Sequence, residues 1–146
     1  MVVKLKPVFE AMQSHLAKSG YFPGGVEVGE PKSAPADLHA ALILGDGIHT
    51  GTTLASTIEQ REIIIRVYVN AMQLPRADIE FMLDDVMAEV EADLLGDFTL
   101  EVTGVRNIVP LGINSRAGYQ DVGGTIFRVL DISIPLMIDG SATFAP

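Results

Sequence analysis

The longest regular pattern in the chain is an alternation of apolar and polar positions over residues 125–138. Such alternation indicates a strand with one buried face. At a rise of about 3.3 Å per residue this strand extends roughly 46 Å, whereas a compact chain of this length is only about 38 Å across. We therefore expect the strand to bend, to overhang its own domain or to lie against a neighbouring copy. Apart from Arg128, the buried face carries only apolar side chains: Ile126, Leu130, Ile132, Ile134, Leu136 and Ile138.

Helical spacing of apolar residues predicts two helices. The first covers residues 6–19, with Pro7 in its first turn and Gly20 at its end, and the second covers residues 75–95. Period-two patterns predict further strands at residues 26–28, 38–44, 57–69, 98–102 and 105–109.

This order of elements predicts an α+β fold. We expect a mainly antiparallel sheet, two main helices packed on one face, and the long final strand. Gly123 and Gly124 are suited to a two-residue hairpin turn before that strand, while residues 114–118 read as a polar loop. Residues 1–139 are predicted to form a single domain and residues 140–146 a loosely ordered tail.

Residues 45–56, with the sequence GDGIHTGTTLAS, read as an extended arm between two strands. The connection is too long for a tight turn, and connections of this length are often functional or ordered by a partner. Its glycines also invite a phosphate-loop interpretation. The segment lacks the lysine of a P-loop and does not open a helix, so a flexible arm is favoured.

Composition limits the classes of function. A hydrophobic content of 48% supports a packed core, and no apolar run reaches the roughly 20 residues of a membrane span. The net charge of −9 resides entirely in residues 41–146. Basic residues do not cluster in the sequence, so direct recognition of nucleic acid is not expected. The absence of cysteine fits a protein made in a reducing cytoplasm.

The sequence offers two kinds of candidate reactive site, a histidine-based metal site and a pair of carboxylates. His15, His39 and His49 could hold a metal with Asp46 or Asp37, but their spacing shows no convergent ligand set, and ordinary histidines are favoured.

The acidic helix could supply paired carboxylates for acid–base chemistry, yet Asp84 and Glu89 define no such pair, and a solvated acidic face is favoured. We find no catalytic motif and predict neither an enzyme nor a cofactor or metal site.

Three segments resemble the tail terminator proteins of long-tailed (siphovirus-type) bacteriophages. They are residues 58–69 (IEQREIIIRVYV), the acidic helix after Pro75, and residues 122–136 (VGGTIFRVLDISIPL). The likeness follows element order over most of residues 1–139 and includes no catalytic motif.

The resemblance implies a structural virion protein of the tail or neck, made in the host cytoplasm. Copies of the subunit, typically six, would form a ring that caps the finished tail tube and ends tube polymerisation. Its partners would be itself, the tail tube protein, and a head–tail connector or neck protein. DNA would pass through the opening without specific binding, which a negative charge suits, and no membrane is involved.

The interface between copies is predicted from charge. Solvated strand arginines are the simpler interpretation, but a charge at the core-facing Arg128 is costly unless an acid meets it, and a neighbouring subunit could supply that acid. We expect a face bearing Arg61, Arg66 and Arg128 to meet the acidic helix of the next copy. The remaining candidate contacts are Asp84, Asp85, Glu89, Asp46, His49 and Thr52.

Two alternatives stay open. The chain could be another neck or tail-completion protein of the same virion. Less favoured is a small metal- or ligand-binding domain that uses the arm and its histidines.

Overall fold

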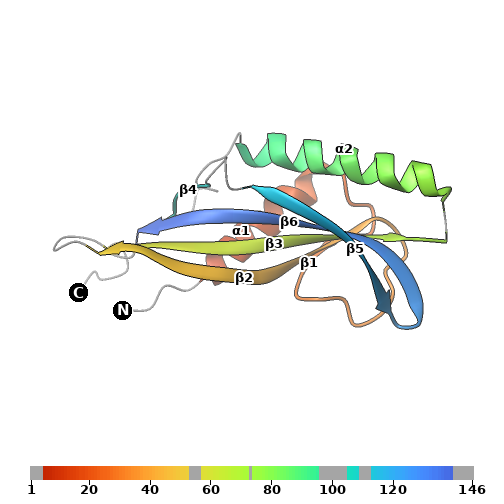
Figure 1. Ribbon diagram of the computed structural model, residues 1–146, viewed down its shortest axis with the longest axis horizontal. Coiled ribbons are helices and arrows are strands. Elements are labelled where there is room, and N and C mark those ends of the chain that lie inside the picture. Colours follow the sequence, from red (N-terminus) through yellow and green to blue (C-terminus); the bar gives the residue numbers. More distant parts are fainter. Residues whose placement is uncertain (1–4, 53–56, 73, 96–104, 109–112, 140–146) are drawn as a thin grey trace.

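The structure is a computed structural model that describes residues 5–52, 57–72, 74–95, 105–108 and 113–139. Two helices and six strands are formed within these residues (Figure 1). In chain order they are α1 (Lys6–Ser19), β1 (Val26–Val28), β2 (His39–Thr52), β3 (Thr57–Asn70), α2 (Arg76–Leu95), β4 (Val105–Ile108), β5 (Asn114–Val122) and β6 (Thr125–Asp139).

The strands form one mainly antiparallel sheet in the order β1-β2-β3-β6-β4, with β5 also paired to β6. Only the pairing of β1 with β2 is parallel. One edge of β6 pairs with β3 from Asn70↔Phe127 to Ile58↔Asp139. Its other edge pairs first with β5 and then with β4. The predicted α+β class and the long final strand are therefore confirmed.

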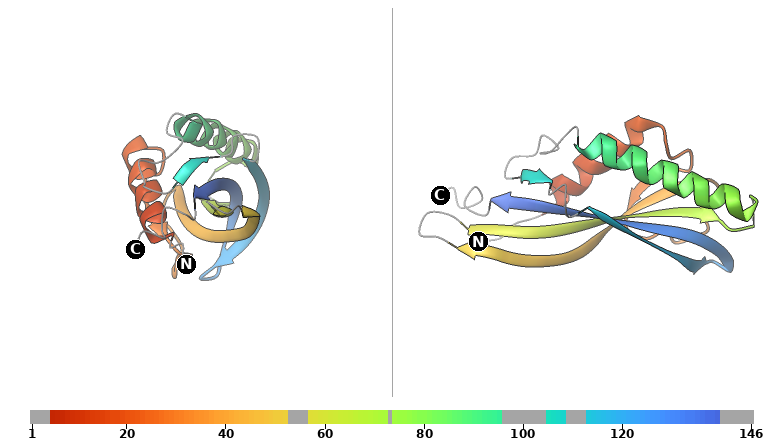
Figure 2. Two further views of the ribbon diagram at one scale, coloured as in Figure 1. Left: turned by 90° about the vertical axis from the view of Figure 1, so that its left-hand side faces the viewer. Right: turned by 45° about the horizontal axis from the view of Figure 1, so that its top comes forward.

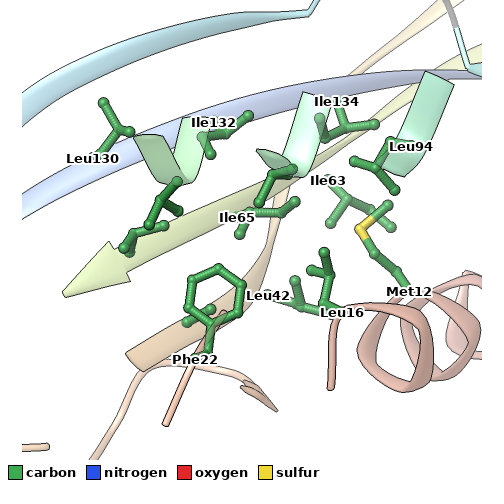
Figure 3. Packing of buried hydrophobic residues seen from close by; sticks show 14 of the residues in the cluster. Met12, Leu16, Phe22, Leu42, Ile63, Ile65, Leu94, Leu130, Ile132 and Ile134 are labelled. Atoms are coloured by element: carbon green, nitrogen blue, oxygen red, sulfur yellow. The ribbon is translucent and has the colours of Figure 1, made fainter. Parts of the chain in front are cut away.

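Both helices contribute apolar side chains to a core on one face of the sheet (Figure 3). Helix α1 begins with proline in its first turn and ends at Gly20, whose φ of 77° is easily reached by glycine. On α2 the buried residues recur at helical spacing and face the alternate apolar positions of β3 and β6. The fully buried centre of this core includes Met12, Leu16, Leu42, Ile63, Ile65, Leu94, Ile132, Ile134 and Leu136.

The long strand both bends and overhangs the helices. Viewed along the molecule, the sheet coils around the core (Figure 2). The ends of β2 and β3 that face their hairpin connection extend beyond both helices (Figure 1). Right-handed strand twist produces the coiling, so the excess length predicted for residues 125–138 appears in the structure as bending and overhang.

Residues 45–52 are wrongly predicted as an arm, because they are paired with β3 as the second half of β2. Register shifts between Leu44 and Gly47 and between His49 and Gly51 interrupt the ladder. Such bulges break the alternation by which a strand is identified from sequence. The β2–β3 connection is correspondingly shorter than predicted.

Strand β5 is also missed by the sequence prediction, which made residues 114–118 a loop. Most of its side chains are exposed, so it has no continuous apolar face to produce a pattern. The predicted glycine turn is confirmed: Gly123 and Gly124 have φ values of 60° and 87°, and the Gly124 amide donates to Asp121 Oδ1 at 2.8 Å. The predicted strand at 98–102 and the tail at 140–146 lie outside the described residues.

Candidate functional site

Arg66 anchors a polar network on the sheet face opposite the helices. It lies directly across from Asp131 of β6, and its Nε and Nη2 donate to the two carboxylate oxygens of Asp131 at 2.7 and 3.0 Å. Its Nη1 donates to Glu30 Oε1 at 2.6 Å and to Gln120 Oε1 at 3.2 Å. The hydrogen bonds to Asp131 raise the pKa of Arg66 above its ordinary value. One guanidinium thus joins β3, β5, β6 and the segment after β1.

That segment, residues 29–38, is named the crossing loop here. It passes over the sheet face opposite the helices (Figure 1), and at its far end the Ala34 amide lies near Gly123 of the β5–β6 turn. A second, smaller apolar cluster lies on this face: Ala41, Tyr68, Val122, Phe127 and Val129. Glu30 therefore ties the crossing loop to the sheet through Arg66.

Tyr68 is fully buried in this second cluster, with its ring edge-on to Phe127. Its hydroxyl makes no hydrogen bond of good geometry within the part of the chain that the structure describes, although the nearby Arg66 guanidinium lowers its pKa in part. Burial raises the pKa of this phenol above its usual 10.0. A buried hydroxyl without a partner carries a desolvation cost that folding does not recover.

Tyr68→Phe is therefore expected to raise the free energy of unfolding at pH 7 by about 1 kcal/mol. Because the folded-state pKa exceeds the unfolded one, wild-type stability should hold below pH 10 and fall as the pH rises above it, and the variant should fall less. Denaturant unfolding at pH 7 and 10.5 measures both effects. The control is Tyr119→Phe, whose exposed ring should leave stability unchanged. A less stable Tyr68→Phe protein would mean that the hydroxyl is hydrogen-bonded.

Arg128 lies on the helix-facing side of β6 and meets an acid, as predicted, but the acid belongs to its own chain. Its Nε and Nη2 donate to the carboxylate of Glu80 on α2 at 2.9 and 3.3 Å, and its Nη1 donates to the Gly118 carbonyl at 3.1 Å. The guanidinium also lies 4.7 Å from the ring centre of Tyr119. These contacts fasten α2 to the β5–β6 hairpin.

The prediction of one face bearing three arginines is wrong. Arg61 is paired with Leu136, and both lie on the helix-facing side, as does Arg128. Arg66 lies on the opposite side, because side chains at odd and even positions of β3 point to opposite faces. The prediction did not apply this parity.

The exposed side of α2 is acidic. Asp84 and Asp85 are exposed and make no ion pair within the described residues. Glu89 accepts a hydrogen bond from the Tyr21 hydroxyl at 2.9 Å, which raises the pKa of Tyr21. Asp84 and Asp85 thus have no charged partner in the described chain.

The sheet has open backbone along both sides. Strand β1 covers β2 only from Ala40 to Leu42. Within the described residues no strand pairs with this edge of β2 beyond that point, and none pairs with the outer edge of β5. Asp46, His49 and Thr52 lie on this open part of β2. Open edges of this length are templates for pairing with another chain.

The histidines do not converge. His39 is buried, with Nδ1 3.0 Å from the Gly24 carbonyl and Nε2 2.8 Å from Glu27 Oε1, so both ring nitrogens are engaged in holding the fold. His15 lies on α1 and His49 on β2. Within the described residues no group of three His, Cys, Asp or Glu side chains could hold a metal ion. Neither described helix has the length and apolar composition of a membrane span.

Comparison with known proteins adds one finding about the fold. No family model and no curated protein matches the chain. Among solved structures, a chain of the virion of the native gene transfer agent (GTA) particle matches with a TM-score of 0.50 and 16% sequence identity, over 88% of this chain and 84% of that one. The two chains share a fold.

Five residues whose side chains belong to the two arginine networks were not singled out from the sequence as partners: Glu30, Glu80, Tyr119, Gln120 and Asp131. Counting back from the Gly123–Gly124 turn places Asp131 opposite Arg116 of β5, but that turn does not fix the register of β6 against β3, which brings Asp131 to Arg66. Glu30 and Glu80 approach from a loop and a helix, and no periodicity encodes those approaches.

Proposed function

We propose that this chain is a tail-terminator-like structural protein of a phage-type virion. In this proposal, copies of the chain form a ring, typically of six, that caps the tail tube, ends tube polymerisation and joins the tail to the head or neck. The fold shared with a virion chain over most of both lengths supports this proposal most strongly. The resemblance of the three sequence segments to tail terminators supports the more specific role.

The open edges of the sheet supply a way to build such a ring. The edge of β2 beyond Leu42 and the outer edge of β5 differ in sequence and lie on different sides of the sheet. Contact between two unlike surfaces repeats head to tail, and it closes into a ring when the rotation is suitable. Asp46, His49 and Thr52 on β2 would then lie at or near the junction.

The acidic side of α2 is the second proposed contact. Asp84 and Asp85 have no charged partner in the described chain, so a basic surface of the next copy, the tube protein or the neck protein could pair with them. Arg61 and Glu89 stay candidate contacts. Arg66 and Arg128 act indirectly, since they hold the crossing loop and α2 in place. A negative surface around a central opening would also let DNA pass without binding.

The test is tube growth in vitro with purified tube subunits. The wild-type protein should stop elongation when added at one ring per tube end. Asp84→Lys/Asp85→Lys should lose at least about tenfold in potency if each carboxylate contributes roughly 1 kcal/mol of pairing. Tube length distributions by electron microscopy measure the effect.

The matched control reverses two acids elsewhere, Glu10→Lys and Asp37→Lys, which are exposed on α1 and the crossing loop. This control should stop growth like the wild type. A wild-type protein that binds finished tails but never shortens them would favour the alternative, a neck or tail-completion protein.

A further inference from the structure

Helix α2 carries a second apolar strip on the side that faces away from the sheet. The ring of Phe81 is 67% exposed there. Ala77 and Ala88 lie one and two turns from it on the same side of the helix, and both are exposed. The opposite side of α2 already packs into the core. A helix with apolar residues on two opposite sides is typically covered on both, so the outer side of α2 is suited to a partner.

The charges around Phe81 restrict what that partner can be. Asp78, Asp84 and Asp85 lie within one turn of Phe81 and are exposed. Two such helices brought together outer side to outer side would repel each other. A suitable partner therefore offers an apolar recess for an aromatic ring and positive charge beside it.

A surface of this kind lies on the same chain, away from the outer side of α2. It is an apolar groove between α1 and the edge of β2, with a volume of about 610 Å³. Its apolar lining includes Phe9, Val28 and Leu44, of which Val28 and Leu44 are 50% and 59% exposed. Two cations and one carboxylate complete it: Lys6, Arg61 and Glu10.

We propose that Phe81 of one copy occupies this groove of the next copy. The three carboxylates beside Phe81 would then lie near Lys6 and Arg61 of that copy, so apolar and charged groups match in one contact. The inference rests on the proposed function for the head-to-tail arrangement of copies, and it names the side chains that join them.

The order of the strands is compatible with this contact. β2 is antiparallel to β3, β3 to β6 and β6 to β5, so β2 and β5 run in opposite directions. When the outer edge of β5 approaches β2 of the next copy around a ring, the two strands are antiparallel and both helix layers lie on the same side. Asp84 and Met87 of α2 line a pocket with Ser115 and Ala117 of β5. α2 therefore accompanies β5 to the junction, where it meets α1 of the next copy.

Cross-linking between copies tests the contact directly, because the chain contains no cysteine. Glu10→Cys places a thiol at the groove, and Ala77→Cys places one a single turn from Phe81. The two variants are purified separately, mixed at high concentration and treated with a short bismaleimide. The mixture should give a cross-link between the two variants. Each variant alone should give none, because a head-to-tail contact does not bring identical positions together.

Sedimentation analysis of self-association tests the role of the ring itself. Phe81→Ala should lower the association constant at least about tenfold, because an aromatic side chain is no longer buried in the contact. Leu44→Ala should also weaken association, and the double variant should lose little more than Phe81→Ala alone, since both changes remove the same contact. The matched control is Met72→Ala, whose side chain is 85% exposed and lies outside the proposed contact. It should associate like the wild type.

A wild type that stays monomeric at its highest soluble concentration would overturn the inference. So would cross-links between identical positions only, or losses for Phe81→Ala and Leu44→Ala that simply add. Tube growth separates this inference from the proposed function. A protein that stops growth without the mixed cross-link would keep the function and refute this contact, whereas the mixed cross-link without any arrest of growth would do the reverse.

Discussion

Replacing Arg66 by methionine is expected to lower the free energy of unfolding by about 2–4 kcal/mol, because it leaves a half-buried acid without its partner. The side chains of Arg66 and Asp131 are only 20% and 27% exposed, and their bidentate pairing is the strong form of such a contact. Glu30 and Gln120 lose a donor at the same time. At this chain length the unfolding midpoint should fall by roughly 6–14 °C, measurable by calorimetry.

Two further variants separate this network from a general charge effect. Arg116→Met removes an exposed arginine from the neighbouring strand β5 and should change stability by less than about 0.5 kcal/mol. Arg66→Met/Asp131→Met removes both charges and should recover much of the loss, since an apolar pair of similar size can replace a buried ion pair. A single variant as stable as the wild type would show that the network contributes nothing.

Ile132→Ala is expected to be at least as damaging, at about 2–5 kcal/mol. Ile132 is fully buried in the middle of β6 and opposite Ile65, and it faces the core shared with both helices. The lost methyl groups leave a cavity that the paired strands on either side cannot close. Chemical denaturation with a constant m-value measures the loss without confusion from partial unfolding.

Ile126→Ala is the matched control on the same strand and the same face. Ile126 is 46% exposed at the start of β6, so its truncation should cost less than about 1 kcal/mol. Equal losses at the two positions would contradict the placement of the core along the middle of β6.

Elements with strong periodicity were predictable from the sequence. Both helices agree with their predicted bounds to within one residue, and β3 and β6 are close to theirs. In each case one face packs into a single core, so burial imposes the period that the pattern shows. The ends of α1 were predictable because proline in a first turn and glycine after a last turn are favoured by local backbone conformation.

The remainder depended on contacts that no local pattern encodes. The second half of β2 carries glycines and two register shifts, and β5 carries mostly exposed residues, so both looked like loops. The roles of Arg66 and Arg128 required knowing which acid lies opposite each of them. Sequence reasoning could state that Arg128 needs an acid, but not that Glu80 of the same chain supplies it.

Strand β6 also has a mechanical consequence. It is hydrogen-bonded along both edges, to β3 over nearly its whole length and to β5 and β4 in succession. A pull along β6 would load these bonds side by side, so they would have to rupture together instead of unzipping one by one. We expect the chain to resist tension along this direction far better than tension that peels β5 away. Under the proposed function, that anisotropy would help each copy in the ring stay folded while DNA passes through the opening.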